Sequence, residues 1–165
     1  MEKDDATFIS LAIEWSRRGM ASGNGPVGAV VVRDGVVLGE GHNRTSIDLD
    51  VTAHGEVVAI RDGLKKMGRL DGLAGATIYT NCQPCPMCYS ACRWAGITRI
   101  VYALSIEDTY SLGKDCGFLD VEHFADLSKP LRDIPQIQLS RAEALPVLEE
   151  FIRLSGRVVG ESPEG

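Results

Sequence analysis

The residues best suited to chemistry are a group of cysteines and, about thirty positions earlier, a histidine and a glutamate. The stretch TNCQPCPMCYSACRWAG contains Cys82, Cys85, Cys88 and Cys92, and the stretch TAHGEV contains His54 and Glu56. Thiolate sulfur and imidazole nitrogen are the ligands that zinc prefers in proteins. These residue types therefore predict a metal site. A redox pair is the alternative, because Cys82 and Cys85 also form a C-x-x-C unit, but it would give HGE no purpose.

Both groups stand at the start of an expected helix. Pro86 suits the first turn of one helix, and Thr52 is the expected N-cap of the other. A helix N-terminus favours thiolate over thiol, and Cys85 and Cys88, three positions apart, can bind the same ion. With His54 they make three protein ligands, which leaves the fourth position of a Zn²⁺ ion for water or hydroxide. An open position of this kind is typical of a catalytic site.

Glu56 is expected to move protons rather than to bind the metal. His54 and Glu56 are two positions apart and do not share a helix face, so both can reach an ion and its water only beyond the first turn. Zinc can lower the pKa of bound water from about 15.7 to about 7. We therefore predict that the metal generates the nucleophile and that Glu56 is the catalytic acid and base.

Cys82 and Cys92 are expected to be packed residues, and Cys116 is assigned no role. Cys82 ends an expected strand, and Cys92 lies one helical turn beyond Cys88 on the apolar side. If either supplied a fourth ligand, the zinc site would be closed, and the chain would be a binding module without turnover. His42 and His123 are lone histidines, to which we assign no function.

The pattern along the chain predicts a mixed sheet with helices on both faces. A hairpin is expected over 28–41, turning at Asp34-Gly35. Strand–helix alternation follows it, which favours an α/β fold. The expected helices cover 7–23, 52–68, 86–96 and 142–156, the other strands cover 76–81, 98–104 and 134–140, and 105–135 reads as irregular.

Length and composition favour one cytoplasmic domain. The chain has 165 residues, a net charge of −6 and 24% charged residues, without an apolar run long enough for a membrane span or the features of a signal peptide. We expect one domain over 1–155 and a flexible tail over 156–165. A nucleic-acid partner is not expected, because such proteins carry a basic footprint.

HGE at 54–56 followed by PCPMC at 84–88 resembles the signature of zinc-dependent nucleobase deaminases. GPVGAVVVRDGVVLGEGHN resembles the hairpin before the site in this superfamily, and ATIYTNCQPCPMC resembles its metal strand, turn and helix. On these motifs the chain is identified as a member of the cytidine-deaminase-like superfamily. The resemblance implies a three-layer α/β/α sandwich with a central mixed five-stranded sheet.

Within the superfamily the chain looks most similar to small bacterial guanine deaminases, through VTAHGEVVAIR, VYALSIEDTYSLGKDCGFLD and IPQIQLSRAE. The resemblance implies hydrolysis of guanine to xanthine and ammonia, and a homodimer that can exchange its C-terminal part. It also implies that Asn43 binds the base ring, Asp108 its far edge, and that Glu143 assists Glu56. From the residues alone, Asn43 could instead make a turn, and Glu143 could form a capping box with Ser140.

Two residues expected to line the substrate pocket differ from those of the guanine deaminases. Gly55 stands where they have alanine, and HGE also occurs in fungal-type cytosine deaminases. Val27 stands where they have a phenylalanine, which removes a stacking ring. Gly55 and Val27 are therefore candidate substrate-binding residues, and the alternatives are a cytosine deaminase or a broad-specificity nucleobase or triazine deaminase. A tRNA adenosine deaminase fits an acidic chain poorly.

Overall fold

A five-stranded mixed sheet forms the centre of the computed structural model, which describes residues 5–113 and 133–154. The strands are β1 (Gly28–Arg33), β2 (Val36–His42), β3 (Thr77–Cys82), β4 (Arg99–Leu104) and β5 (Gln136–Gln138), in the order β2-β1-β3-β4-β5. β1 pairs antiparallel with β2 and β3, and β4 pairs parallel with β3 and β5. The expected mixed five-stranded sheet is confirmed. The tail predicted over 156–165, Cys116 and His123 lie outside the described residues.

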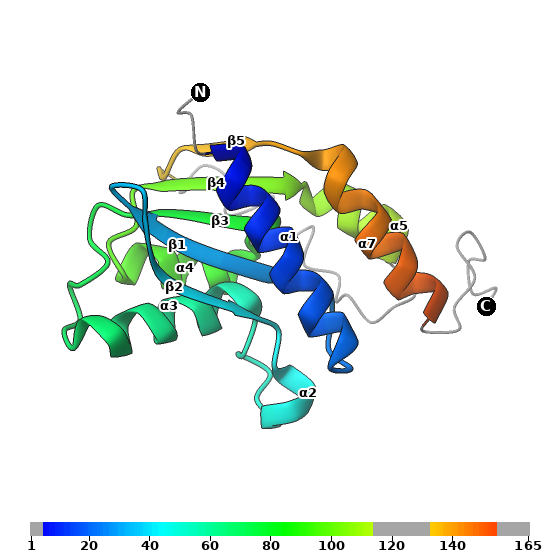
Figure 1. Ribbon diagram of the computed structural model, residues 1–165, viewed down its shortest axis with the longest axis horizontal. Helices are drawn as coiled ribbons and strands as arrows, with labels where there is room; N and C mark the ends of the chain where they lie inside the picture. Colours follow the sequence, from blue (N-terminus) through cyan, green and yellow to red (C-terminus); the bar gives the residue numbers. More distant parts are fainter. Residues whose placement is uncertain (1–4, 114–132, 155–165) are drawn as a thin grey trace.

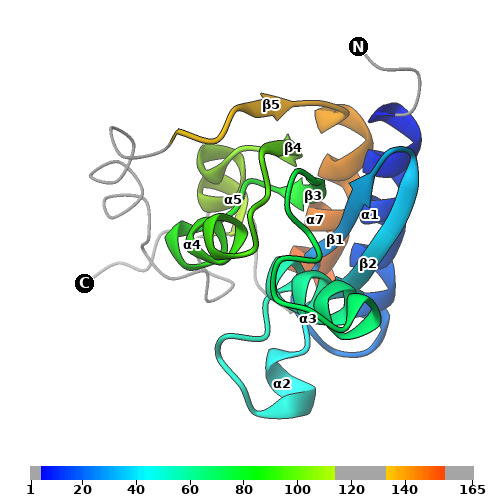
Figure 2. The same ribbon diagram turned by 90° about the vertical axis from the view of Figure 1, so that its left-hand side faces the viewer.

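The helices form one layer on each face of the sheet. They are α1 (Asp5–Ala21), α2 (Thr45–Asp48), α3 (Gly55–Met67), α4 (Pro86–Trp94), α5 (Ile106–Gly113) and α7 (Arg141–Leu154). α1 and α7 lie on one face, and α3 and α4 on the other (Figures 1 and 2). None of the helices in the described parts is both long and apolar enough to cross a bilayer.

Alternation along the strands builds a core on each side. Successive side chains of a strand point to opposite faces. Val30 and Val32 of β1 therefore pack with α1 and α7, whereas Ala29 and Val31 pack with α3 and α4. Because both faces are covered, all four side chains are buried, and β1 reads as a continuous apolar run.

The hairpin turns as its sequence predicts. Asp34 and Gly35 both have positive φ, 53° and 74°. Two-residue turns with positive φ match the twist of paired strands, and Asp-Gly adopts them at low cost. This tight turn keeps β2 beside β1. The last residues of β2 therefore lie beside the start of β1, at the end of the sheet where α3 begins.

Two local predictions were wrong, and one short helix was not predicted. α3 begins at Gly55 with His54, not Thr52, in the N-cap position, and the hydroxyl of Thr52 instead donates to Asp50 at 2.6 Å. Part of the segment expected to be irregular forms α5. The short helix α2, between β2 and α3, was not predicted.

Candidate active site and metal centre

Two helix starts bring the predicted metal ligands together at one end of the sheet. Cys85 is the N-cap residue of α4, directly after β3, and His54 is the N-cap residue of α3. The Nδ1 atom of His54 lies 3.5 Å from the Sγ of Cys88 and 3.8 Å from the Sγ of Cys85. Because Pro86 occupies the first helical position, α4 starts immediately after Cys85 and turns Cys88 toward the same point.

The three side chains fit a zinc ion. Their ligand atoms all lie within 4.8 Å of one another. Zn–S and Zn–N bonds of about 2.3 and 2.0 Å at tetrahedral angles place sulfur and nitrogen about 3.5 Å apart, which agrees with the observed separations. Over the described part of the chain, neither Cys82 nor Cys92 belongs to this group. The geometry therefore matches three protein ligands, as expected of a site with an open position.

The Cys85 sulfur also has the electrostatics of a metal ligand, whereas the pKa of the Cys88 thiol is raised, first because it donates a hydrogen bond to Cys85 and then by burial. The Cys88 thiol donates a hydrogen bond to Cys85, and with a second contribution from His54 this lowers the pKa of Cys85 to about 4. Cys85 is therefore a thiolate, the form that binds metal, at neutral pH. Burial instead raises the pKa of Cys82 and Cys92, which stay neutral packed thiols, as predicted.

Glu56 is buried beside this group. Its side chain is in the first turn of α3, the residue is only 2% exposed, and its Oε2 atom has no hydrogen-bond partner among the described residues. Burial first, and then the negative charge of Cys85, raise the pKa of Glu56 to about 7. A bound divalent cation would oppose this shift. An unpartnered buried carboxyl oxygen costs about 1–3 kcal/mol or more, so its position requires a functional explanation.

Asn43, Gly55 and Val27 lie together next to the start of α3. The Oδ1 atom of Asn43 accepts a hydrogen bond from the Gly55 N–H at 2.7 Å, and its own N–H donates to the Val27 carbonyl at 2.8 Å. A Cβ on Gly55 would lie 2.7 Å from that same carbonyl oxygen. Gly55 is thus required for the close approach of α3 to Val27. The Val27 side chain packs in the core on the α1 side.

Asn81 is a buried residue that the sequence analysis missed. Its Oδ1 accepts from the Gly28 N–H at 2.8 Å, and its Nδ2 donates to the Pro26 carbonyl at 2.7 Å. Asn81 therefore fixes the backbone on both sides of Val27. An asparagine near the end of a strand with a buried pattern, one position before Cys82, was the available signal.

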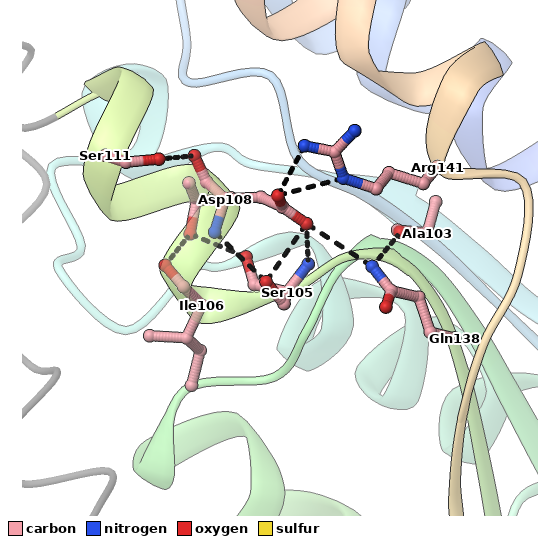
Figure 3. Close-up of polar contacts among 8 residues, drawn as sticks. Ala103, Ser105, Ile106, Asp108, Ser111, Gln138 and Arg141 are labelled. Carbon is pink, nitrogen blue, oxygen red and sulfur yellow. Dashed lines mark hydrogen bonds and ion pairs between the residues drawn. The ribbon is translucent and has the colours of Figure 1, made fainter.

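Asp108 is held in a dense set of hydrogen bonds (Figure 3). Its Oδ2 accepts from the N–H and the hydroxyl of Ser105, both at 3.0 Å, and from Gln138 at 3.3 Å. Its Oδ1 accepts from Nε and Nη2 of Arg141, at 2.9 and 2.7 Å. Arg141 is the main reason why the pKa of Asp108 is lowered to about 2. Both oxygens are therefore occupied in this structure.

Glu143 lies apart from the metal group, in the first turn of α7. It is exposed, and its carboxylate accepts a hydrogen bond from the Ser10 hydroxyl of α1 at 3.1 Å. In a capping box each side chain bonds the backbone N–H of the other residue. Among the described residues, Ser140 and Glu143 instead share a backbone bond from the Glu143 N–H to the Ser140 carbonyl at 3.1 Å, and Ser140 has a positive φ of 59°. The structure therefore brings together His54, Glu56, Cys85 and Cys88, with Asn43, Gly55 and the Val27 backbone adjacent, and it places Glu143 in a contact between helices.

Comparison with known proteins agrees with this geometry. Residues 2–104 match the family described as the cytidine and deoxycytidylate deaminase zinc-binding region. Over 142 residues the chain is 37% identical to the guanine deaminase of Bacillus subtilis, covering 84% of this chain and 88% of that protein. It is 35% identical over 117 residues to a tRNA-specific adenosine deaminase of Haemophilus influenzae, covering 70% and 67%.

A solved structure extends the similarity to the whole chain. The guanine deaminase of Bacillus subtilis covers 98% of this chain, and the chain covers 99% of it, with 33% identity and a TM-score of 0.65. The chain therefore has the cytidine-deaminase-like fold, and His54, Cys85 and Cys88 are positioned to bind the zinc ion that this fold uses. The chain belongs to the cytidine and deoxycytidylate deaminase zinc-binding family and is a zinc-dependent deaminase.

Proposed function

We propose that the chain hydrolyses free guanine to xanthine and ammonia. The observation that carries the chemistry is the buried carboxyl oxygen of Glu56, which lies without a partner beside the three-ligand group. The choice of guanine is supported by the similarity to the Bacillus subtilis guanine deaminase, which extends past residue 104 into β5 and α7. Water supplies the oxygen of the product, and the exocyclic amine leaves as ammonia.

The residues of the chain would divide the work as follows. A bound Zn²⁺ supplies Lewis acidity, which lowers the pKa of water toward neutrality. Glu56 would take one proton from the attacking water and pass it to a ring nitrogen of the base. It would then take the second proton, from the hydroxyl now on the ring carbon, and pass it to the amine as the C–N bond breaks, so that ammonia leaves and the carbonyl forms. Burial keeps bulk water from competing for these protons.

Asn43 is proposed to orient the base. Its Oδ1 is bound to Gly55, so the amide is fixed with Nδ2 as the free end. Nδ2 has no hydrogen-bond partner within the described residues, and an NH₂ group can donate to an acceptor on the base. Gly55 lies next to Asn43 and against the Val27 backbone, where the Cβ of an alanine would come within 2.7 Å of the Val27 carbonyl oxygen.

The roles of Asp108 and Glu143 stay predictions. For Asp108 to bind the far edge of a base, one of its present bonds must break, and the 3.3 Å bond from Gln138 is the longest of them. Glu143 would have to leave Ser10 to assist Glu56. Alanine scanning of both residues against kcat and KM separates substrate contact from packing.

Cytosine is the second candidate substrate. The observation that favours it is Gly55, because HGE resembles the fungal-type cytosine deaminases and the wall at Val27 leaves no room for the alanine of the guanine enzymes. A triazine or another amino-substituted base could enter the same site. A tRNA is a less suitable substrate than a free base, because tRNA is a polyanion and the chain itself has a net charge of −6.

The assembly and location are also proposals. We propose a homodimer in the cytoplasm, by analogy with the small guanine deaminases that the sequence resembles. Size-exclusion chromatography with light scattering measures the mass, and a monomer would contradict the proposal. Crosslinking between the C-terminal segment and the body of a second copy tests exchange.

The deciding experiment is ammonia release from the zinc-loaded protein with guanine, cytosine, adenine, their nucleosides and triazines. We expect a preference for guanine. Glu56→Gln should keep zinc and the unfolding temperature but lose at least about 10²-fold in kcat, whereas Glu149→Gln, at an exposed carboxylate of α7, should match the wild type. Turnover retained in Glu56→Gln would contradict the mechanism, and preference for cytosine would contradict the substrate.

A further inference from the structure

His42, the last residue of β2, lies with its ring in a tight space against α1. The ring centroids of His42 and Trp15 are 5.9 Å apart, with an interplanar angle of 33°. A Cβ on Gly19 would lie 3.0 Å from the Cβ of His42 and 3.2 Å from its Cγ and Nδ1. Any larger residue at position 19 would therefore displace the ring. The imidazole has a defined place, built by one face of α1.

Trp15 is itself fixed from two sides. Its Nε1–H donates to Oε2 of Glu40 at 3.2 Å, and the guanidinium carbon of Arg18 lies 4.7 Å from the centroid of its ring. A cation over an aromatic face is attracted to it, and a buried indole N–H usually finds an acceptor. The stack of Arg18, Trp15 and His42 therefore orders the histidine ring although it is only half-buried.

The ordered ring holds the next residue. The Nδ1 atom of His42 lies 2.7 Å from the carbonyl oxygen of Asn43. A carbonyl oxygen can only accept, so Nδ1 carries the proton. The N–H of Asn43 is bound to Val27 and its Oδ1 to Gly55. Three of the four polar groups of Asn43 are thus engaged, and the remaining one is Nδ2.

We propose that His42 is a positioning residue for Asn43, and that it acts by holding the Asn43 peptide so that Nδ2 is presented to the base. The inference rests on the proposed function, in which Asn43 binds the substrate. His42 fixes the main-chain carbonyl, and Gly55 fixes the side-chain oxygen. The amide then cannot rotate, so less entropy is lost when the base binds.

Two substitutions separate the hydrogen bond from the stacking. His42→Phe keeps a flat ring against Trp15 but removes the donor. His42→Asn removes the ring but keeps an N–H at the same distance from the backbone as Nδ1. Asn43→Ala is the reference variant, since it removes the proposed donor itself. The readouts are KM and kcat for guanine, zinc content, and the unfolding temperature of the zinc-loaded protein.

We expect His42→Phe to raise KM roughly tenfold, the effect of losing one organising hydrogen bond, with zinc content unchanged and kcat changed much less than KM. His42→Asn should recover most of that loss. A merely structural role would instead lower the unfolding temperature of both variants together and leave KM alone. If His42→Phe does not fold, the comparison of His42→Gln, whose donor lies at the Nε2 position, with His42→Asn takes its place.

The outcomes are distinguishable. If Asn43→Ala raises KM and His42→Phe does not, the inference about His42 is overturned and the proposed function stands. Equal losses in His42→Phe and His42→Asn would also overturn it, because the donor would then be irrelevant. If Asn43→Ala leaves KM unchanged, the proposed role of Asn43 fails, and the inference fails with it.

Discussion

Cys85 and Cys88 differ from Cys82 and Cys92 in what surrounds the sulfur, not in residue type. The first two lie within reach of the His54 ring, and hydrogen bonds from Cys88 and His54 make Cys85 a thiolate. The pKa of Cys88 is raised mainly because its thiol donates to the Cys85 thiolate, whereas the pKa values of Cys82 and Cys92 are raised mainly by burial, and neither of these two lies in the ligand group of the described residues. Reactivity in this chain is therefore decided by position at the start of α4.

Replacing one ligand sulfur should remove the metal. We expect Cys88→Ser to bind less than stoichiometric zinc and to lose activity, because a hydroxyl is a far weaker ligand than a thiolate at neutral pH. Cys92→Ala is the matched control, since it removes a neighbouring buried sulfur outside the ligand group. Zinc is measured with a colorimetric chelator after unfolding. Zinc loss in the control but not in Cys88→Ser would contradict the assignment.

A substitution at Gly55 tests the close approach between the start of α3 and the Val27 backbone. Alanine normally stabilises a helix relative to glycine by about 0.5–1 kcal/mol, but here its Cβ would meet the Val27 carbonyl at 2.7 Å, and backbone cannot yield cheaply. We expect Gly55→Ala to destabilise the protein by about 1–3 kcal/mol and to change KM more than zinc content. Thermal unfolding and steady-state kinetics measure both effects. A stabilised variant would show that Val27 can move away.

At the scale of elements, Asp108 joins three parts of the fold. Asp108 and Ser105 form a reciprocal capping box at the start of α5, because the Asp108 N–H also donates to the Ser105 hydroxyl at 3.0 Å. Arg141 connects the same carboxylate to α7, and Gln138 connects it to β5 (Figure 3). The contact orders the segment that follows β4, at the edge of the sheet next to the site.

Removing the charge of Asp108 should loosen this junction. We expect Asp108→Asn to cost about 1.5–3 kcal/mol of unfolding free energy, the range for hydrogen bonds to charged groups, because the side chain is only 15% exposed. The control is Arg153→Gln, whose 3.9 Å ion pair with Glu150 is largely exposed and should matter little. Chemical denaturation gives both values. Equal stabilities would show that the junction does not contribute.

The stability of the whole molecule depends in part on the buried carboxylate of Asp5, which binds the first turn of α1 to the central sheet. Its Oδ2 lies 2.6 Å from Arg99 of β4, and its Oδ1 accepts from Tyr79 of β3 at 2.7 Å. The residue is 1% exposed. The hydrogen bond from Arg99 is the main reason why the pKa of Asp5 is lowered from its usual value of 3.8.

The lowered pKa of Asp5 predicts that the protein loses stability at acid pH. A carboxyl whose pKa is lower in the folded state stabilises the fold fully above about pH 4 and loses that contribution as the pH falls through the folded pKa. We therefore expect the gap in unfolding temperature between wild type and Asp5→Asn to be constant from pH 5 to 7 and to narrow below pH 4. Differential scanning fluorimetry across pH 3–7 measures it. A gap that widens in acid would reverse the sign and contradict the argument.

Features that depend on local spacing could be predicted before the fold was known. Local patterns predicted the hairpin at Asp34-Gly35, the ligand pair Cys85 and Cys88 around Pro86, and the HGE stretch at 54–56 that holds His54 and the proposed catalytic carboxyl of Glu56, because each pattern acts within a few residues. The capping box at Ser105 and Asp108 was equally local, and it could have indicated α5 within the segment read as irregular.

Features that depend on partners far apart in the chain became evident only in the folded structure. Arg141, which lies far along the chain from Asp108, donates hydrogen bonds to the Asp108 carboxylate. The family resemblance had implied that this carboxylate binds the substrate. The Val27 carbonyl excludes a side chain at Gly55, and Trp15 orders His42 beside Asn43. These contacts join segments that are adjacent only after the sheet has formed. No pattern along the chain encodes them, because their strength comes from burial and geometry rather than from sequence spacing.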